Sequence, residues 1–315
     1  MNFNIMNFNS EEDIVTKGNL EITTKMGCSN MCEYCPQIKL IKEYKKGQGK
    51  QTRADKFMTV ENFKKFISTI PKEIDFHFTG YVEPFDNPVC DELLMISHEA
   101  GHKVQLNTTL EGLTKEKFDR IKNLPFKTFI IHMASGTYYE RIGRKLPIKQ
   151  DDNGFDILRE DWLELLEYVV RNKPVNFKVL SHGGAHPKAV EVLQRLANEG
   201  VLQQEHVSNL NISTSTRSQN KAQDDKEIVR QKIPPQFNIR GKCSRIYQSV
   251  LLPDGRMGLC CQDYGLEHVV GDLSKQTWKE YRTTEYFRKI AVEGENLCDY
   301  CDMGYHTYGD KKDND

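Results

Sequence analysis

Three cysteines lie within eight residues near the start of the chain, in the run Gly27-Cys28-Ser29-Asn30-Met31-Cys32-Glu33-Tyr34-Cys35-Pro36. Three thiolates placed this closely can ligate three irons of one iron–sulfur cube. The fourth iron then has no protein ligand, and such an open position is what the activation of a bound molecule needs. The alternative is half of a structural zinc site, which requires a fourth ligand. The nearest further His or Cys in the sequence is His77.

Five more cysteines gather toward the end of the chain: Cys243, Cys260, Cys261, Cys298 and Cys301. Eleven residues separate Cys243 from Gly255, and four separate Gly255 from Cys260. The run Pro253-Asp254-Gly255-Arg256 predicts a hairpin turn with Gly255 at its tip. A helix predicted over 278–290 would return the chain to the last two cysteines. Four thiolates brought together in this way can ligate a complete cube, and a zinc ribbon stays an alternative.

The composition is that of a globular protein, with 38% hydrophobic and 28% charged residues and a net charge of −1. This balance predicts no attraction to nucleic acid or to a membrane surface. No apolar run approaches the roughly 20 residues that span a bilayer, and the first residues do not read as a signal peptide. We therefore expect a cytoplasmic protein, in which nine cysteines favour metal or redox chemistry over disulfides.

Strand-like and helix-like segments alternate along most of the chain, and this pattern must position the cysteines. Strands are predicted at 20–24, 74–78, 104–107, 128–133, 175–180 and 210–213. Helices are predicted at 59–70, with Thr59 as the cap, and at 88–100, 115–122, 162–171 and 187–199. The pattern indicates an α/β fold with a parallel sheet and right-handed crossovers. The first cysteines directly follow the first strand, where the loops of such a sheet carry reactive groups.

Composition also predicts where the domains begin and end. We expect an N-terminal extension over 1–17, a core domain over 18–234, a small cysteine-rich domain over 235–305 and a disordered tail over 306–315. The boundary follows the polar stretch 214–231 and the pair Pro234-Pro235. A segment with so little apolar core is where a bound metal contributes most to folding. Cys90, in contrast, falls on a predicted helix and is expected to be a buried apolar residue.

The C-x3-C-x2-C motif, with an aromatic residue before its last cysteine, resembles the signature of the radical S-adenosylmethionine (SAM) superfamily. The strand order resembles that superfamily as well. The resemblance implies a partial (β/α)6 TIM-like barrel of parallel strands. It also implies a [4Fe–4S] cluster held by Cys28, Cys32 and Cys35, whose open iron is chelated by SAM. One electron, from a flavodoxin- or ferredoxin-type donor, cleaves SAM to a 5′-deoxyadenosyl radical that abstracts a substrate hydrogen.

The resemblance also implies contacts to SAM. The run Phe78-Thr79-Gly80-Tyr81-Val82-Glu83-Pro84 follows the second strand, like the family's glycine-rich turn, with Val82 in place of the usual second glycine. Its glutamate would receive the methionyl amine as a charge-assisted hydrogen bond. Together with residues near the adenine, the ribose and the carboxylate, the implied set is Tyr34, Gly80, Glu83, Asn107, Ser135 and Lys178. The alternative is that these are ordinary loop and strand-end residues, and no residue stands out as the catalytic base.

The pattern C-x11-G-x4-C followed by C-x2-C resembles the Twitch module, a shortened SPASM module of the same superfamily. It implies one auxiliary [4Fe–4S] cluster held by Cys243, Cys260, Cys298 and Cys301. Cys260 is chosen over Cys261 because its spacing from Gly255 fits. A fully ligated cluster accepts or relays electrons, which favours oxidation of a small polar molecule. In length and cysteine layout the sequence resembles the Twitch-bearing 2-deoxy-scyllo-inosamine dehydrogenases.

Two other functions stay open at this point. Modification of a peptide or protein side chain, by a maturase or epimerase, is known among SPASM relatives. About 17 residues precede the first strand, too few for a leader-binding domain, and this favours a small molecule. A non-catalytic zinc-binding protein is the more remote alternative. The basic segment 39–56, with Arg141 and Arg144, is either an anion site or a solvated loop.

Overall fold

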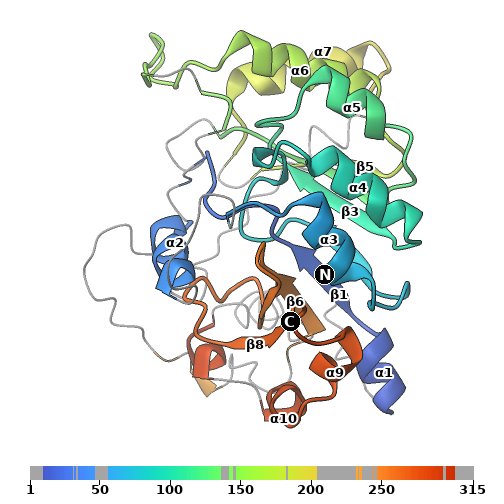
Figure 1. Cartoon of the computed structure of the whole chain (residues 1–315). Coiled ribbons are helices and arrows are strands. Elements are labelled where there is room, and N and C mark those ends of the chain that lie inside the picture. Colours follow the sequence, from blue (N-terminus) through green and yellow to red (C-terminus); the bar gives the residue numbers. More distant parts are fainter. Residues whose placement is uncertain are drawn as a thin grey trace, which may run out of the picture.

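One continuous sheet organises the chain (Figure 1). The computed structural model describes residues 10–30, 32, 35–46, 56–135, 142–144, 147–181, 184–203, 232, 234–235, 243, 247–293 and 296–301. The strand order is β5-β4-β3-β2-β1-β6-β7-β8. The bounds are β1 Asn19–Ile22, β2 Asp75–Phe78, β3 Val104–Thr108, β4 Thr128–His132, β5 Phe177–Leu180, β6 Gln248–Leu251, β7 Arg256–Gly258 and β8 Val269–Asp272.

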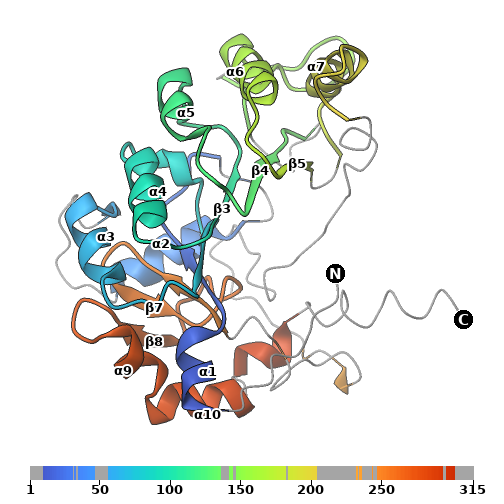
Figure 2. The same cartoon turned by 90° about the vertical axis from the view of Figure 1, so that its right-hand side faces the viewer.

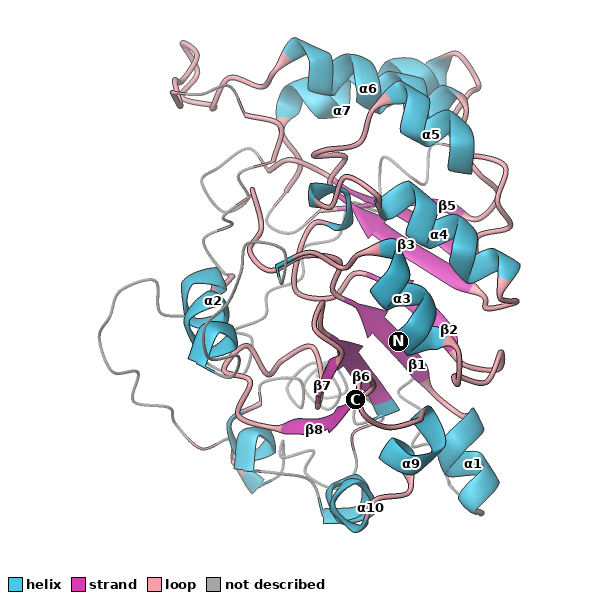
Figure 3. Cartoon of the chain, in the orientation of Figure 1, coloured by secondary structure: helices cyan, strands magenta, loops and turns pink. Residues whose placement is uncertain are grey.

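Strands β1 to β5 pair in parallel, each with its predecessor, and helices connect them. The helices are α1 Glu11–Thr16, α2 Gln37–Lys46, α3 Val60–Ile67, α4 Cys90–Glu99, α5 Lys115–Ile121, α6 Glu160–Arg171, α7 Pro187–Asn198, α9 Trp278–Arg282 and α10 Glu285–Glu293. Figure 3 shows α3, α4 and α5 along one side of the strands and α2 on the other, and Figure 2 shows α5, α6 and α7 continuing the outer layer. The predicted α/β fold with a partial TIM-like barrel is confirmed.

The C-terminal strands extend the same sheet. Strand β6 pairs in parallel with β1, with Leu20 opposite Ser249 and Ile22 opposite Leu251. The predicted hairpin follows, with β7 antiparallel to β6 and Gly255 at φ +92 in the turn. The predicted strand 210–213 lies outside the described residues. The domain boundary at 234–235 stays a prediction. Strands from both sides of it belong to the one described sheet.

The single helix predicted over 278–290 is wrong, because two helices stand there. The hydroxyl of Thr283 donates back to Lys279 O at 2.8 Å, and that of Thr284 accepts from Phe287 N at 3.1 Å. Threonine hydroxyls that bond the local backbone favour helix ends over helix interiors. The chain therefore ends α9 and begins α10 at this pair.

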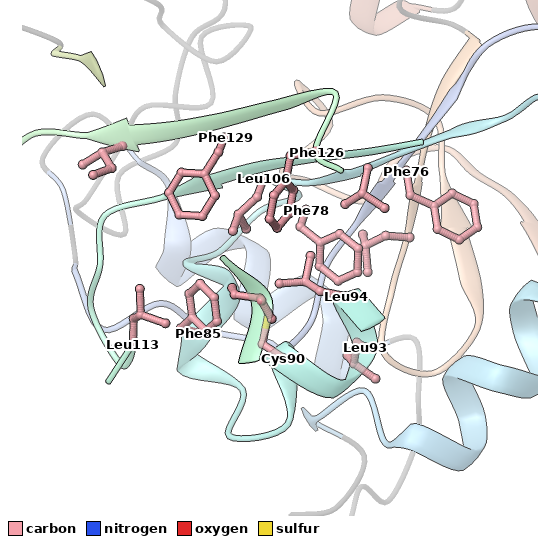
Figure 4. Packing of buried hydrophobic residues seen from close by; sticks show 14 of the residues in the cluster. Phe76, Phe78, Phe85, Cys90, Leu93, Leu94, Leu106, Leu113, Phe126 and Phe129 are labelled. Atoms are coloured by element: carbon pink, nitrogen blue, oxygen red, sulfur yellow. The ribbon is translucent and has the colours of Figure 1, made fainter. Parts of the chain in front are cut away.

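The main core lies between the sheet and the outer helices (Figure 4). Alternate strand residues, such as Phe76 and Phe78, point into it because side chains alternate along a strand. Cys90 is fully buried there, as predicted. The intervening residues, such as His77, face the opposite side of the sheet.

The described end of the predicted N-terminal extension contacts the C-terminal helix α9. The indole of Trp278 donates to Val15 O at 2.8 Å, and Arg282 donates to Ile14 O at 2.8 Å. The predicted tail 306–315 lies outside the described residues. Within the described part of the chain, no helix combines the length and the apolar character that crossing a membrane requires.

Candidate functional site

The first cysteines lie on the loop between β1 and α2, at the carboxyl end of β1. The backbone N–H of Cys35 donates to Cys32 O at 3.0 Å. The side chain of Gln37, the first residue of α2, donates to Cys35 Sγ at 3.4 Å. The loop therefore closes into a turn that leads directly into the helix.

Cys28 is tied to the loop that follows β2. The backbone N–H of Glu83 donates to Cys28 Sγ at 3.4 Å, and that of Asn30 also points at this sulfur. Burial raises the pKa of the Cys28 thiol, and the carboxylate of Asp86 raises it further. Burial thus favours the neutral thiol, whereas a bound cation such as iron would favour the thiolate.

Glu83 is buried, with 3% of its surface exposed, and accepts hydrogen bonds at the end of β3. Its carboxylate accepts from Thr108 Oγ1 at 2.7 Å, from both Oγ1 and N of Thr109 at 2.7 Å, and from Phe85 N at 3.2 Å. Burial raises the pKa of Glu83 to about 7, although these donors lower it. The methionyl amine predicted to bind here would have to share or replace one of these donors.

Gly80 allows the loop after β2 to cross the end of β1. Its φ is +26, and a Cβ added there would lie 2.6 Å from Thr23 Oγ1 and 2.7 Å from Ile22 O. The close approach therefore requires glycine whether or not SAM is bound. The predicted contact of Gly80 with SAM stays a prediction.

The other predicted SAM contacts lie on or after β3, β4 and β5, and Lys178, expected late in its strand, is the second of the four residues of β5. Asn107 of β3 and Lys178 of β5 stand in register with Ile130 of β4, one on each side. They share the sheet face that turns away from the core, roughly 10 Å apart across two strand spacings. Ser135, beyond β4, is fully buried and bridges to Ala185. Tyr34 lies outside the described residues.

In the second set of cysteines, Cys260 and Cys301 lie near each other. Burial raises the pKa of the Cys260 thiol, and the neighbouring thiols of Cys261 and Cys301 raise it further. Cys260 packs against the main core, whereas Cys261 is buried in a second cluster that also contacts Cys28 and Cys35. The two adjacent cysteines therefore face different surroundings.

Cys298 and Cys301 lie on one turn, and Cys243 lies in a separate described position of the chain. The backbone N–H of Cys301 donates to Cys298 O at 3.3 Å. Cys243 is half-buried, and residues 236–242 and 244–246 on either side of it lie outside the described residues. Within the described ranges, no three His, Cys, Asp or Glu side chains converge to hold a single metal ion. Thiolates that ligate different irons of a cube stand further apart than the ligands of one ion.

The comparison with known families decides the class of the protein. The model of the radical SAM superfamily matches residues 22–208, which is more than half of the chain. The chain belongs to the radical SAM superfamily. Membership implies a [4Fe–4S] cluster that binds SAM, and the matched region contains Cys28, Cys32 and Cys35. No curated protein matches the chain.

Solved structures with bound S-adenosylmethionine share the fold. BtrN in complex with AdoMet and 2-DOIA is 17% identical with a TM-score of 0.52, over 90% of this chain and 92% of that one. The anSMEcpe structure with bound AdoMet is 12% identical with a TM-score of 0.50, over 93% and 96%. SuiB of Streptococcus suis, bound to S-adenosylmethionine, is 14% identical with a TM-score of 0.47, over 88% and 68%. The likeness to BtrN and anSMEcpe establishes the fold alone.

The cysteine loop fits the cluster that radical SAM proteins hold. All nine cysteines are free of disulfides. Backbone N–H groups aimed at Cys28 Sγ, and the Gln37 amide aimed at Cys35 Sγ, suit sulfurs that carry negative charge. The protein itself therefore supplies hydrogen-bond donors to two of the three cysteine sulfurs.

Several site residues escaped the sequence analysis. Thr108 and Thr109 hold Glu83, and Asp86 holds Ser29 beside Cys28. The strand alternation could have revealed a further group, because polar residues occupy the face opposite the core: Asn19, Glu21, Asp75, His77, Gln105, Asn107, His132 and Lys178.

Arg144, considered as an anion ligand, is buried in an ion pair with Asp156.

Proposed function

We propose that this protein is a radical SAM enzyme in which Cys28, Cys32 and Cys35 hold the [4Fe–4S] cluster. When bound, that cluster supplies one electron that breaks a carbon–sulfur bond of SAM, giving methionine and a 5′-deoxyadenosyl radical. The radical then takes a hydrogen atom from the substrate. The observation that carries this proposal is the cysteine triplet on the loop after β1, inside the region that matches the superfamily.

We assign the binding of SAM to Tyr34, Gly80, Glu83, Asn107, Ser135 and Lys178. The contact between Glu83 N and Cys28 Sγ, at 3.4 Å, supports this assignment because it joins the proposed amine site to a proposed iron ligand. The shared register of Asn107 and Lys178 supports it as well, because one molecule can reach both.

We propose that Cys243, Cys260, Cys298 and Cys301 hold an auxiliary [4Fe–4S] cluster in a Twitch-like module. The proximity of Cys260 and Cys301 supports this set. With all four irons ligated by protein, the cluster would accept the electron that a substrate radical loses after deprotonation. The overall reaction would be dehydrogenation, with a flavodoxin or ferredoxin as the electron donor for the first cluster. Free thiols and iron–sulfur clusters suit a reducing compartment such as the cytoplasm.

A small polar molecule is the proposed substrate class. The sheet face opposite the core is lined by hydrogen-bonding side chains of both charge signs, including Glu21, His77, Gln105 and Lys178. Such a surface suits hydroxyl and amino groups. BtrN, which shares this fold, was solved in complex with the small molecule 2-DOIA, and this agrees with the proposed substrate class.

The metal content of anaerobically purified protein tests these assignments. Two cubes correspond to about eight irons per chain, and replacing Cys28, Cys32 and Cys35 by alanine should leave about four. Cys90→Ala is the matched control, because Cys90 is buried in the core and should leave the iron content unchanged. Zinc without iron in the wild-type protein would contradict the proposal.

A further inference from the structure

A tyrosine from the C-terminal part of the chain reaches the first cysteine loop. The Tyr264 hydroxyl lies 3.6 Å from Cys35 Sγ, although 229 residues separate the two in sequence. Tyr264 is buried, with 3% of its surface exposed. Gln37 approaches the same sulfur at 3.4 Å. Cys35 thus has one hydrogen-bonding group from its own segment and one from the C-terminal part of the chain.

Tyr264 is held in place by a ring contact with Tyr81 and by the hydrogen-bonded loop that carries it. Its ring packs edge-on against that of Tyr81, with centroids 4.8 Å apart. The Tyr81 hydroxyl donates to Cys260 O at 2.8 Å and to Asp263 O at 3.2 Å. The buried carboxylate of Asp263 accepts from the backbone of Glu267 at 3.0 Å and of His268 at 2.9 Å. The loop that presents Tyr264 is therefore fixed mainly by its own backbone, and the ring of Tyr81 packs against Tyr264.

The direction of the Cys35–Tyr264 hydrogen bond must change when iron binds. In the metal-free chain, the Cys35 thiol donates to the Tyr264 oxygen. A thiolate that ligates iron carries no proton, so the only donor left between the two groups is the tyrosine O–H. Hydrogen bonds to the sulfurs of an iron–sulfur cluster are among the features that set its reduction potential.

We propose that Tyr264 is a positioning residue that raises the reduction potential of the cluster held by Cys35. This inference rests on the proposed function, because it takes Cys35 as an iron ligand. Reduction adds one electron, supplied by the flavodoxin- or ferredoxin-type donor, and a donated hydrogen bond stabilises the added negative charge on sulfur. The same tyrosine pair joins the backbone of Cys260 to Cys35, so the two sets of cysteines share one packed contact.

Tyr264→Phe tests the proposal because it removes the hydroxyl and keeps the ring against Tyr81. Tyr81→Phe is the matched control: it removes a buried hydroxyl whose hydrogen bonds go to backbone carbonyls and not to Cys35. The two carbonyls that lose the Tyr81 hydroxyl each keep a backbone donor. Asp263 N donates to Cys260 O and Leu266 N donates to Asp263 O, both at 3.0 Å. Thermal unfolding of the metal-free proteins should show that both variants fold.

The readout is a potentiometric titration followed by electron paramagnetic resonance, on the signal that changes when SAM is added. We expect a more negative midpoint potential in Tyr264→Phe and an unchanged one in Tyr81→Phe. Replacing Tyr264 by 3-fluorotyrosine, which keeps the shape and donates more strongly, should shift the potential the other way and covers the case in which Tyr264→Phe does not fold. An unchanged potential in these Tyr264 variants would overturn the inference. Failure of the wild-type protein to form this cluster would instead overturn the proposed function.

Discussion

Asp86 holds both the backbone and the side chain of Ser29. Its Oδ2 accepts from Ser29 N at 2.7 Å, and its Oδ1 accepts from Ser29 Oγ at 2.7 Å. Ser29 directly follows Cys28, and Asp86 lies in the short 3-10 helix Pro84–Asp86 after β2. The loop that carries the cysteines is therefore anchored to the neighbouring loop of the sheet independently of any metal.

Asp86→Ala should weaken iron uptake at the first cysteines. Loss of two hydrogen bonds to a carboxylate should lower the free energy of unfolding of the metal-free protein by about 1–3 kcal/mol. A loop that is no longer held must be ordered when iron binds, so iron incorporation should be slower and less complete. Iron content after reconstitution measures this effect. Asp75→Ala is the control, because Asp75 begins β2 and its partner Lys127 directly precedes β4, at the strand ends opposite the cysteine loop. Equal iron loss in both variants would contradict the account.

Gly80→Ala should be markedly more destabilising than an ordinary glycine substitution. The new Cβ would meet backbone and side-chain atoms of β1 and of Thr23 at 2.6–2.8 Å, at a φ of +26. Strain and overpacking together should cost about 2–5 kcal/mol. Urea unfolding of the metal-free protein measures this loss.

Gly200→Ala is the matched control for that substitution. Gly200 has a φ of +75, but a Cβ added there meets nothing within 4 Å. Only the backbone strain of about 1–2 kcal/mol should then appear. Similar losses at the two positions would show that the crossing of β1 by the loop after β2 does not depend on glycine.

The sequence alone predicted the features that depend on local pattern. Alternation and capping residues such as Thr59 located strands β1 to β5 and helices α3 to α7, and Gly255 located the hairpin, whereas α1 and α2 were not predicted. Contacts between distant segments left no local signal: the pairing of β6 with β1, and the approach of Tyr264 to Cys35 across 229 residues. The break between α9 and α10 was missed because the apolar spacing continues through it, while hydroxyl bonds of Thr283 and Thr284 decide the backbone.

An ion-pair network between α6 and α7 predicts a pH dependence of stability. Hydrogen bonds from Arg195, and then from Arg171, lower the pKa of Glu167 to about 2. Because this pKa is depressed, the stabilisation is present above the unfolded pKa of about 4.3 and is lost as the pH falls through the folded value. The side chains are partly exposed, so Glu167→Gln should cost less than about 1 kcal/mol at pH 7.

Urea unfolding of the wild-type protein and of Glu167→Gln should therefore differ at pH 7 and converge toward pH 2. The exposed Glu164 on the same helix provides the control, because Glu164→Gln should show a smaller difference at pH 7. A difference between wild type and Glu167→Gln that grows as the pH falls would contradict the assigned sign.

The release of 5′-deoxyadenosine tests the central claim most directly. Wild-type protein, reconstituted anaerobically with iron and sulfide and supplied with SAM and a reductant, should release 5′-deoxyadenosine and methionine in equal amounts. The variant in which Cys28, Cys32 and Cys35 are all replaced by alanine should release none, while it keeps the iron assigned to the C-terminal cysteines. Release that survives this triple replacement, or an iron-loaded wild-type protein that releases none, would contradict the account.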